Sequence, residues 1–436
     1  MRVPAADAIP LRENMDPHLC RGALARLLIL AFAIMLAAAT APARAQPAPP
    51  FKDLLQQAQA AAPRLVESAA NIRAAEGLAV QAAVRPNPSL GLEVENLGVN
   101  KGNNGLSNTQ TTLSVGQPFE LGGKRQARIE AGSASLEAAQ ARNRQVVVDF
   151  GYDLAIAYAA AEAAQARSGL SEEALAAAQE DLRAAQALVN AGREADLRAV
   201  QAQAAVAASE ADLETARATA QTTFAQLANL AGVALPYSAV DSSLLPLAAH
   251  LPALPLAPPA LTPAVATAQA DRDAAARRVI VEQTRAVPDV IGSLGIRRIG
   301  GDNATLFVGG ISVPLPLFDK NQGNIAASLA QRDAAEARLS AARLEAENSY
   351  RASVAQAMAA DARLKASMQA ETAAGEAYRL ARIGYDAGRT PLIELLTARR
   401  NLTSVQSATV DARLARINAE AALARLFGRI PFGGNP

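Results

Sequence analysis

Residues 117–126 read QPFELGGKRQ and residues 313–322 read VPLPLFDKNQ, and each stretch joins a strand-like segment to a very long alanine-rich segment. Both belong to a duplication in which Pro118 to Gly232 recurs, without an insertion, as Pro314 to Gly428. The matching positions include Lys124 and Lys320, Gln126 and Gln322, Ile129 and Ile325, Arg142 and Arg338, and Arg183 and Arg379. Such internal repetition is typical of a wall built from similar units and argues against a single enclosed pocket.

The composition favours elongated helical packing over a large globular core. Of the 436 residues only 3% are aromatic, tryptophan is absent and alanine is abundant. Small side chains let helices pack closely, whereas a compact core of this size normally uses bulky residues. The formal net charge of +1 offers no basic footprint for nucleic acid.

Residues 1–45 have the pattern of a secretory signal peptide. Basic residues precede the apolar run 27–39, which ends near a small-residue cleavage site. A transmembrane anchor is the alternative, although about 20 apolar residues are needed to span a bilayer. Either Met1 or Met15 can be the start. Because Cys20 precedes the apolar run, the mature chain is predicted to lack disulfides and thiolate metal sites.

Two strand hairpins are predicted, at 88–118 and 288–314. Their residues alternate with the period of two that is expected of a strand. One face is apolar and the other carries carboxylates, hydroxyls and glycines. The positions assigned to the apolar face are Leu90, Leu92, Val94, Leu113 and Val115 in the first hairpin, and Val290, Leu294, Ile296, Thr305, Phe307, Ile311 and Val313 in the second.

A long helical hairpin is predicted after each strand hairpin. The helices expected over 124–189 and 321–386 contain no proline, and at 1.5 Å per residue each would be roughly 100 Å long. Gly192 and Gly388 end them, and shorter helices then return. The predicted organisation is a signal peptide (1–45), a first repeat (46–232) with a helix at 51–84 and a helical tip near 190–196, a proline-rich linker (233–262), a second repeat (263–428) with a helix at 264–286 and a tip near 386–391, and a tail (429–436).

Four amphipathic strands cannot enter a bilayer as an open sheet, because every backbone donor and acceptor must be paired there. Closure needs at least about eight strands, and hence more than one copy of the chain. Three copies would supply twelve strands, with the polar face toward water and the helices continuing as a tube. The alternative is a soluble periplasmic coiled-coil protein whose hairpins form ordinary sheet.

The chain resembles the TolC family of outer-membrane efflux proteins, and within it the heavy-metal, CzcC-like branch. Segments 87–96, 117–125 and 313–323 carry the resemblance, which covers nearly the whole mature chain. It implies a membrane α+β fold, in which a trimeric outer-membrane β-barrel, four strands per protomer, continues into a long periplasmic α-helical barrel. It also implies a location in the outer membrane of a Gram-negative bacterium. The implied partners are outer-membrane lipid, a periplasmic adaptor (membrane fusion) protein and an inner-membrane, proton-driven resistance-nodulation-division pump.

The two helix breaks are candidate docking sites. Turning one long helix into another favours glycine, so turn chemistry alone can account for Gly192 and Gly388. In resembling proteins the same tips contact the adaptor. The candidate contacts are Gly192, Arg193, Leu197, Gly388, Arg389 and Thr390.

A candidate gate follows the second tip. Residues 385–398 align with the family segment that holds an acidic entrance gate, with Glu394 at the first acidic position and Thr397 in place of the second. Threefold symmetry would bring the Glu394 carboxylates together, which attracts cations. A solvated glutamate on a helix face is the alternative. Glu93 and Glu95 would line the exit with six carboxylates per trimer.

Catalysis is not predicted. His250 is the only histidine after the predicted signal peptide, and no nucleophile and base pair accompanies it. Residues 122–125 lack the spacing of a phosphate loop and are interpreted as a strand-to-helix hinge. The sequence thus predicts a passive duct, without cofactor or metal site, for cobalt, zinc, cadmium or nickel cations. A duct for drugs or other organic solutes, a periplasmic adaptor and a structural coiled-coil protein are the alternatives.

Overall fold

The computed structural model describes residues 46–97, 109–241, 243–251, 261–301 and 303–433. The predicted signal peptide, the first hairpin loop and part of the predicted linker lie outside the described residues. From Gln46 onward the chain forms one contact unit, and the description below concerns this unit.

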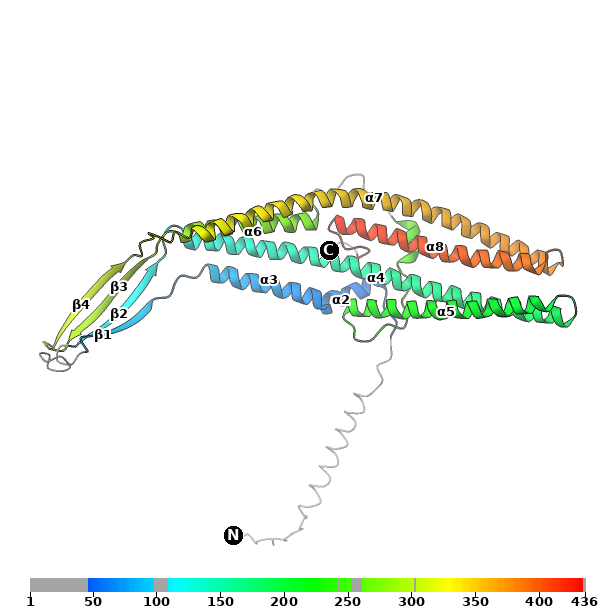
Figure 1. Cartoon of the computed structure of the whole chain (residues 1–436), viewed down its shortest axis with the longest axis horizontal. Coiled ribbons are helices and arrows are strands. Elements are labelled where there is room, and N and C mark those ends of the chain that lie inside the picture. The colour runs from blue at the N-terminus through cyan, green and yellow to red at the C-terminus, as the bar shows by residue number, and fades with distance from the viewer. Residues whose placement is uncertain (1–45, 98–108, 242, 252–260, 302, 434–436) are drawn as a thin grey trace, which may run out of the picture. The chain divides into compact units, whose positions relative to one another are not determined.

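The four strands that the structure describes form one antiparallel sheet in chain order (Figure 1). They are β1 (Ser89–Glu95), β2 (Gln110–Phe119), β3 (Val290–Ile299) and β4 (Ala304–Ser312). Both predicted strand hairpins are therefore confirmed, and the pairing of β2 with β3 joins the two repeats. Among the described strands β1 and β4 are the edges, so each has one side without a strand neighbour.

The pairing register gives the sheet one apolar face. A row of directly paired residues crosses all four strands and consists of Leu92, Leu113, Ile296 and Phe307. Successive side chains of a strand point to opposite faces, so the apolar face predicted from the alternation is confirmed. Leu294 and Phe307 are 76% and 90% exposed. A large exposed apolar surface of this kind marks contact with lipid or another protein.

The first repeat contains α2 (Phe51–Ala61), α3 (Pro63–Ala82), α4 (Lys124–Asn190) and α5 (Asp196–Ala231). The single helix predicted over 51–84 is wrong, because Pro63 divides it into α2 and α3. Ala62 is extended, with φ −64° and ψ 124°, as expected for a residue that precedes proline. The 67-residue helix α4 agrees with the sequence prediction.

The second repeat contains α6 (Pro263–Arg285), α7 (Gln322–Asp386) and α8 (Leu392–Leu426), and the short 3-10 helix η2 (Leu245–His250) precedes it. The backbone N–H of Val265 donates to the Thr262 side chain at 3.3 Å, which caps α6. Pro263 suits the first position of α6, where no N–H is needed. None of the described helices combines the length and the apolar composition that crossing a bilayer requires.

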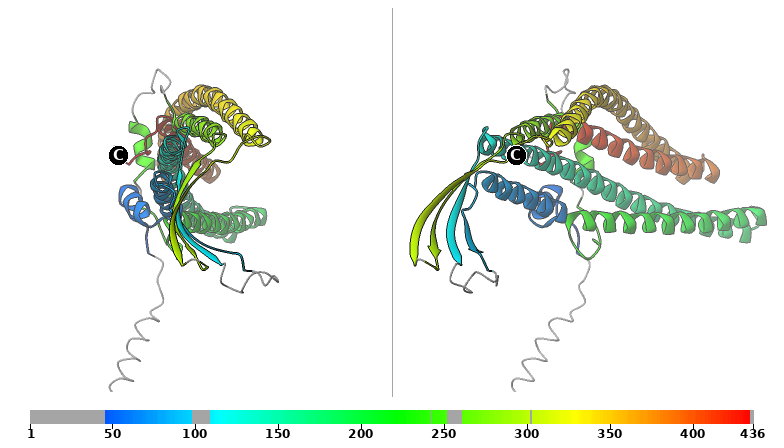
Figure 2. Two further views of the ribbon diagram at one scale, coloured as in Figure 1. Left: turned by 90° about the vertical axis from the view of Figure 1, so that its left-hand side faces the viewer. Right: turned by 60° about the vertical axis from the view of Figure 1, so that its left-hand side comes forward.

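Helix α4 lies between other helices along most of its length (Figures 1 and 2). It packs against α3 and α6 in its first half and against α5 and α8 in its second half. Helix α7 packs mainly on α6 and α8 among the described elements. Alanine supplies many of the buried positions, including Ala155, Ala159 and Ala161 on α4. The close packing through small residues that the composition predicts is therefore confirmed.

The largest buried cluster surrounds Tyr158 on α4. The Tyr158 ring contacts the Phe51 ring edge to face, with centroids 5.7 Å apart. Its hydroxyl lies 3.0 Å from the backbone oxygen of Pro49 and 2.9 Å from that of Asp241, either of which can accept its proton. Burial raises the pKa of Tyr158 to about 12. The cluster thus ties the start of the unit and the linker to the middle of α4.

A buried carboxylate on α4, one turn after Tyr158, also binds the linker. Glu162 is 2% exposed and accepts hydrogen bonds from the backbone N–H groups of Leu244 (3.0 Å) and Leu245 (3.1 Å). Desolvation raises the pKa of Glu162. One turn further along α4, Gln165 donates to the Val240 oxygen and accepts from the Val240 N–H. The linker is therefore bound to α4 through its backbone.

Candidate pore face, gate and docking sites

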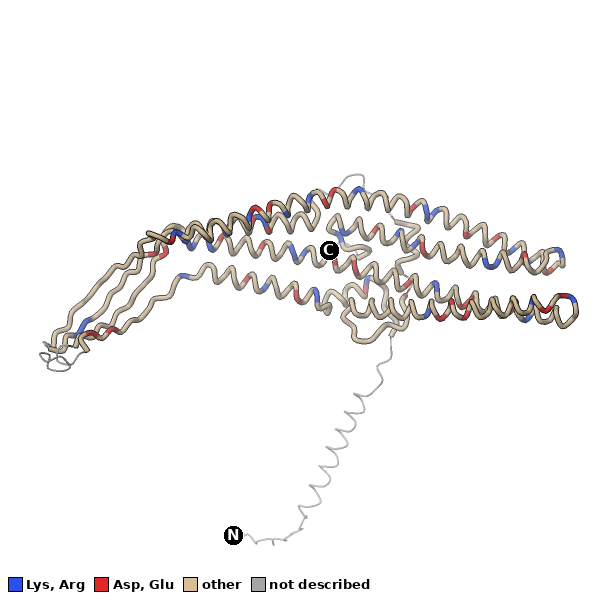
Figure 3. Tube along the Cα trace, in the orientation of Figure 1, with Lys and Arg blue, Asp and Glu red and all other residues tan. Residues whose placement is uncertain are grey.

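The polar face of the sheet carries three charged residues among those that the structure describes. They are Glu93 and Glu95 on β1 and Arg297 on β3. The register places Glu93 and Arg297 on either side of Thr112 in β2. Figure 3 shows the charged residues of the sheet near the strand ends that lie away from the helices.

Arg297 reaches across β2 toward β1. Its Nη2 atom lies 3.4 Å from Oε2 of Glu95, its Nε donates to Thr112 at 3.0 Å, and its Nη1 donates to Gln110 at 3.2 Å. Glu93 is exposed and forms no ion pair within the described part of the chain. Sequence reasoning selected both carboxylates but missed this arginine. Arg297 follows Ser293 and Gly295 at alternate positions of β3, and this alternation could have placed it on the polar face.

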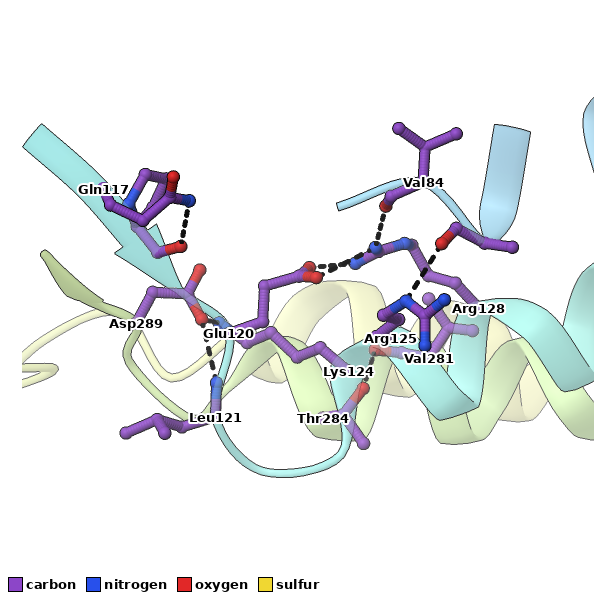
Figure 4. Close-up of polar contacts among 12 residues, drawn as sticks. Val84, Gln117, Glu120, Leu121, Lys124, Arg125, Arg128, Val281, Thr284 and Asp289 are labelled. Carbon is purple, nitrogen blue, oxygen red and sulfur yellow. Dashed lines mark hydrogen bonds and ion pairs between the residues drawn. The ribbon is translucent and has the colours of Figure 1, made fainter. Parts of the chain in front are cut away.

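The junction between β2 and α4 is held by charged side chains (Figure 4). Arg128 forms an ion pair with Glu120 and donates to the backbone oxygen of Val84 at 3.2 Å. Lys124 lies 2.6 Å from the Asp289 carboxylate. The hydrogen bond to Glu120 raises the pKa of Arg128. Carboxylates and a backbone oxygen of the same chain therefore bind these basic groups. The segment joins β2 to α4, which confirms the predicted strand-to-helix hinge.

Two glycines make the turn from β2 into α4. Gly122 and Gly123 have φ values of +68° and +76°, a region that other residues rarely adopt. A Cβ atom on Gly122 would lie 2.7 Å from Val287, in the connection between α6 and β3, whereas a Cβ on Gly123 would meet open space. Both positions therefore need glycine for the positive φ, and Gly122 also needs it because Val287 lies so close.

The first helical tip is the turn between α4 and α5. Gly192 has φ +68°, and its N–H donates to Val189 at 2.9 Å. The N–H of Arg193 donates to the Leu188 oxygen at 2.9 Å, which closes the C-terminus of α4. The side chains of Arg193 and Leu197 are exposed, with Leu197 65% accessible. Both predicted contact residues are thus available at the surface of the described chain.

The second tip, between α7 and α8, has the same construction. Gly388 has φ +70°, and the N–H of Arg389 donates to the Gly384 oxygen at 2.8 Å. Arg389 is exposed and Thr390 is half-buried. The Thr390 hydroxyl fills the space beside Gly384, where an added Cβ would lie 2.1 Å from it. Thr390 therefore also supports the turn.

The predicted gate residues lie in the first two turns of α8. Glu394 is exposed and belongs to the first turn, where a negative charge is favourable to the helix dipole. Thr397 is also exposed, and its hydroxyl donates to the Ile393 oxygen at 2.7 Å. The two side chains lie one turn apart on one side of the helix. A single chain contains neither a ring of Glu394 carboxylates nor the pore that they would constrict.

A cleft of about 740 Å³ between α4, α5 and α8, lined by alanines together with charged and hydroxyl side chains, was not foreseen from the sequence. Arg399 bridges α8 to α4 through Glu180 at 3.2 Å, and Asp181 lies beside them. Burial raises the pKa of Asp181, although nearby arginines oppose this change. The arginine and carboxylate pairs connect helices that are far apart in sequence, so no local pattern identifies them.

Metal-binding geometry is absent from the described residues, which bring no three His, Cys, Asp or Glu side chains together. The charged groups described above can instead attract or repel a nearby ion through their charge alone. They belong to an amphipathic sheet that is joined to long helical hairpins.

Residues 54–233 and 260–429 match the outer membrane efflux protein family. The chain therefore belongs to this family. Membership confirms both the resemblance found in the sequence and the predicted outer-membrane location. It argues against the adaptor and the structural coiled-coil protein as alternatives.

Relatives of known name fall in the predicted branch. The chain is 46% identical over 407 residues to the nickel-cobalt-cadmium resistance protein NccC of Alcaligenes xylosoxydans xylosoxydans, covering 91% of each chain. It is 45% identical over 385 residues to the nickel and cobalt resistance protein CnrC of Cupriavidus metallidurans, covering 88% of this chain and 92% of CnrC. The cobalt-zinc-cadmium resistance protein CzcC of the same organism is 30% identical over 368 residues, covering 84% and 86%. The CzcC-like branch is thereby confirmed.

The fold is also found in solved structures. The outer membrane protein VceC of Vibrio cholerae superposes with a TM-score of 0.69 at 23% identity, over 87% of this chain and 96% of VceC. The predicted class of fold, that of the TolC-like outer-membrane proteins, is confirmed at this level.

Proposed function

We propose that this protein is the outer-membrane exit duct of a tripartite system that exports divalent heavy-metal cations. The observation that carries the proposal is the identity of 46% and 45% to NccC and CnrC, which are named for nickel, cobalt and cadmium resistance. The similarity extends over 91% and 88% of this chain, and the family match over 54–233 and 260–429 includes the strands, the long helical hairpins and both tips.

Three copies of the chain form the duct. Each repeat, 46–232 and 263–428, contributes one strand hairpin and one helical hairpin to the wall. The free edges of β1 and β4 support this assembly, because unpaired backbone groups are costly in lipid. Closure between copies removes both edges and gives a barrel of twelve strands with the apolar face outward.

The helical tips contact a periplasmic adaptor, which connects the duct to a proton-driven pump in the inner membrane. The exposed Arg193, Leu197 and Arg389 support this role because they offer charge and apolar surface at the turns. Gly192, Gly388 and Thr390 shape those turns. Glu394 with Thr397 forms the gate. The duct performs no catalysis and supplies no energy, so ions move through it passively.

A replacement experiment tests this function. The gene for the chain is introduced into Alcaligenes xylosoxydans that lacks NccC, with NccC itself as the positive control and an empty vector as the negative control. We expect growth on nickel and cobalt to be restored and cell-associated nickel, measured by mass spectrometry, to fall. Heat-resistant trimers in the outer membrane without any gain in tolerance would contradict the proposal.

An organic-solute duct is the second candidate, because the fold alone does not distinguish the cargo. The same strains are grown with a lipophilic dye and with a detergent. Gain of tolerance to these compounds, without gain of tolerance to nickel, would favour this second candidate.

A further inference from the structure

We propose that Arg297 sets the ion preference of the duct's sheet region by neutralising Glu95, which leaves Glu93 as the acidic group of each copy on the described polar face. This inference rests on the proposed function, since it requires the polar face to line a pore. It concerns selectivity, which family membership does not specify.

The first support is the geometry of Arg297. Three of its nitrogen atoms face oxygen atoms of Glu95, Thr112 and Gln110, at 3.4, 3.0 and 3.2 Å. The guanidinium is planar and rigid, so several simultaneous contacts fix both its position and its orientation. Thr112 is 5% exposed beneath it. Arg297 therefore presents a fixed positive charge, and the Glu95 carboxylate is held beside it.

The second support is the charge of the polar face. Among the described residues of this face, the carboxylates of Glu93 and Glu95 and the guanidinium of Arg297 give a net charge of −1 per copy. Without Arg297 the same face would carry −2. Fixed charges along a water-filled pore raise the local concentration of oppositely charged ions. The arginine thus halves the acidic charge that would otherwise attract cations.

The third support is the position of these charges in the sheet. All three lie on β1 and β3, whereas β4 contributes Leu306, Val308 and Gly310 to the same face. Each copy then presents one charged stripe and one uncharged stripe to the pore. A substitution within the charged stripe consequently changes the electrostatic potential near that stripe more than elsewhere on the polar face.

Purified trimers in planar lipid bilayers test the inference. The reversal potential in a KCl gradient gives the ratio of potassium to chloride permeability. Arg297→Gln should increase the preference for cations, and Glu95→Gln should decrease it. The double variant, Glu95→Gln with Arg297→Gln, should return close to the original ratio. Arg297→Lys keeps the charge and should change the ratio least.

A matched control lies one residue away. Arg298 is on the opposite face of β3 and donates to the Asn303 side chain at 2.9 Å. Arg298→Gln removes the same charge without reaching the polar face, so the permeability ratio should stay unchanged. A purely structural role for Arg297 would predict losses of trimer stability without opposite shifts in ion preference.

We expect Arg297→Gln and Glu95→Gln each to change the permeability ratio by about twofold in 0.1 M salt and less in 1 M salt, because the Debye length falls from about 10 Å to 3 Å. Shifts of the same sign in Glu95→Gln and Arg297→Gln, or an equal effect of Arg298→Gln, would overturn the inference while the duct stands. Trimers that form no pore in any variant would overturn the proposed function itself.

Discussion

Among single residues, Glu162 offers a test of how the linker is attached to α4. Its carboxylate accepts the N–H groups of both Leu244 and Leu245 and is almost fully buried. Glu162→Gln keeps one acceptor oxygen but turns an amide N–H₂ toward the second donor. We expect a loss of about 1–3 kcal/mol in the free energy of unfolding, since a buried donor is left unsatisfied. Thermal denaturation followed by circular dichroism measures the loss.

The same substitution changes the pH dependence of stability. Burial raises the pKa of Glu162 above its ordinary value of 4.5, so the folded protein binds this proton more tightly than the unfolded chain does. The stability contributed by this group therefore falls as the pH rises from 4.5 through the raised pKa. Glu162→Gln should lack this slope. Parallel stability curves for the two proteins as the pH rises above 4.5 would contradict the assignment.

Sequence reasoning identifies residues whose signal is local and misses those whose partners are remote. Strand alternation was enough to place Glu93 and Glu95 on the polar face. The ion pair of Glu95 with Arg297 depends on the pairing of strands from different repeats, which no local pattern encodes. The hydrogen bonds of Glu162 likewise depend on the path that the linker takes past α4.

At the scale of elements, the junction between β2 and α4 distinguishes two roles of glycine. Gly122→Ala and Gly123→Ala both place a side chain at positive φ, which costs about 1–2 kcal/mol in either case. Only Gly122→Ala also brings a Cβ to 2.7 Å from Val287. We expect it to lose about 1–3 kcal/mol more in unfolding free energy than Gly123→Ala does, because the site is already packed.

Gly123→Ala is the matched control, since it has the same backbone requirement and open space around it. Heat dissociation of trimers on gels and calorimetric melting give the comparison. Equal losses in the two variants would show that Val287 does not stay close to Gly122.

The elements themselves were largely predictable from the sequence. Long stretches without proline predicted α4 and α7, and the glycines predicted both helical tips. The division of the first helix by Pro63 was missed, because proline is compatible with the first position of a helix and the surrounding residues are all helix formers. The short helix η2 was missed because it depends on contacts with α4.

At the scale of the whole molecule, the duplication indicates how copies of the chain can meet. Counting from Pro118 and Pro314, Val115 corresponds to Ile311; counting from Pro88 and Pro288, Leu294 corresponds to Val94. Since Val115 pairs directly with Leu294 within the chain, Ile311 of one copy should pair with Val94 of the next. The sequence could not give this register, because it requires the observed pairing of β2 with β3.

Cysteine cross-linking tests that register. Directly opposite residues have Cβ atoms about 4.5–5.5 Å apart, close to what a disulfide needs. The pair Ile311→Cys with Val94→Cys should therefore give covalent trimers on oxidation, seen on non-reducing gels. Ile311→Cys with Leu90→Cys is the control, because Leu90 lies on the same face but about 13 Å further along the strand at 3.3 Å per residue. Linkage through position 90 in place of 94 would mean that the junction between copies does not repeat the junction within the chain. Absence of linkage in both, with trimers intact, would mean that β1 and β4 are not neighbours in the assembled wall.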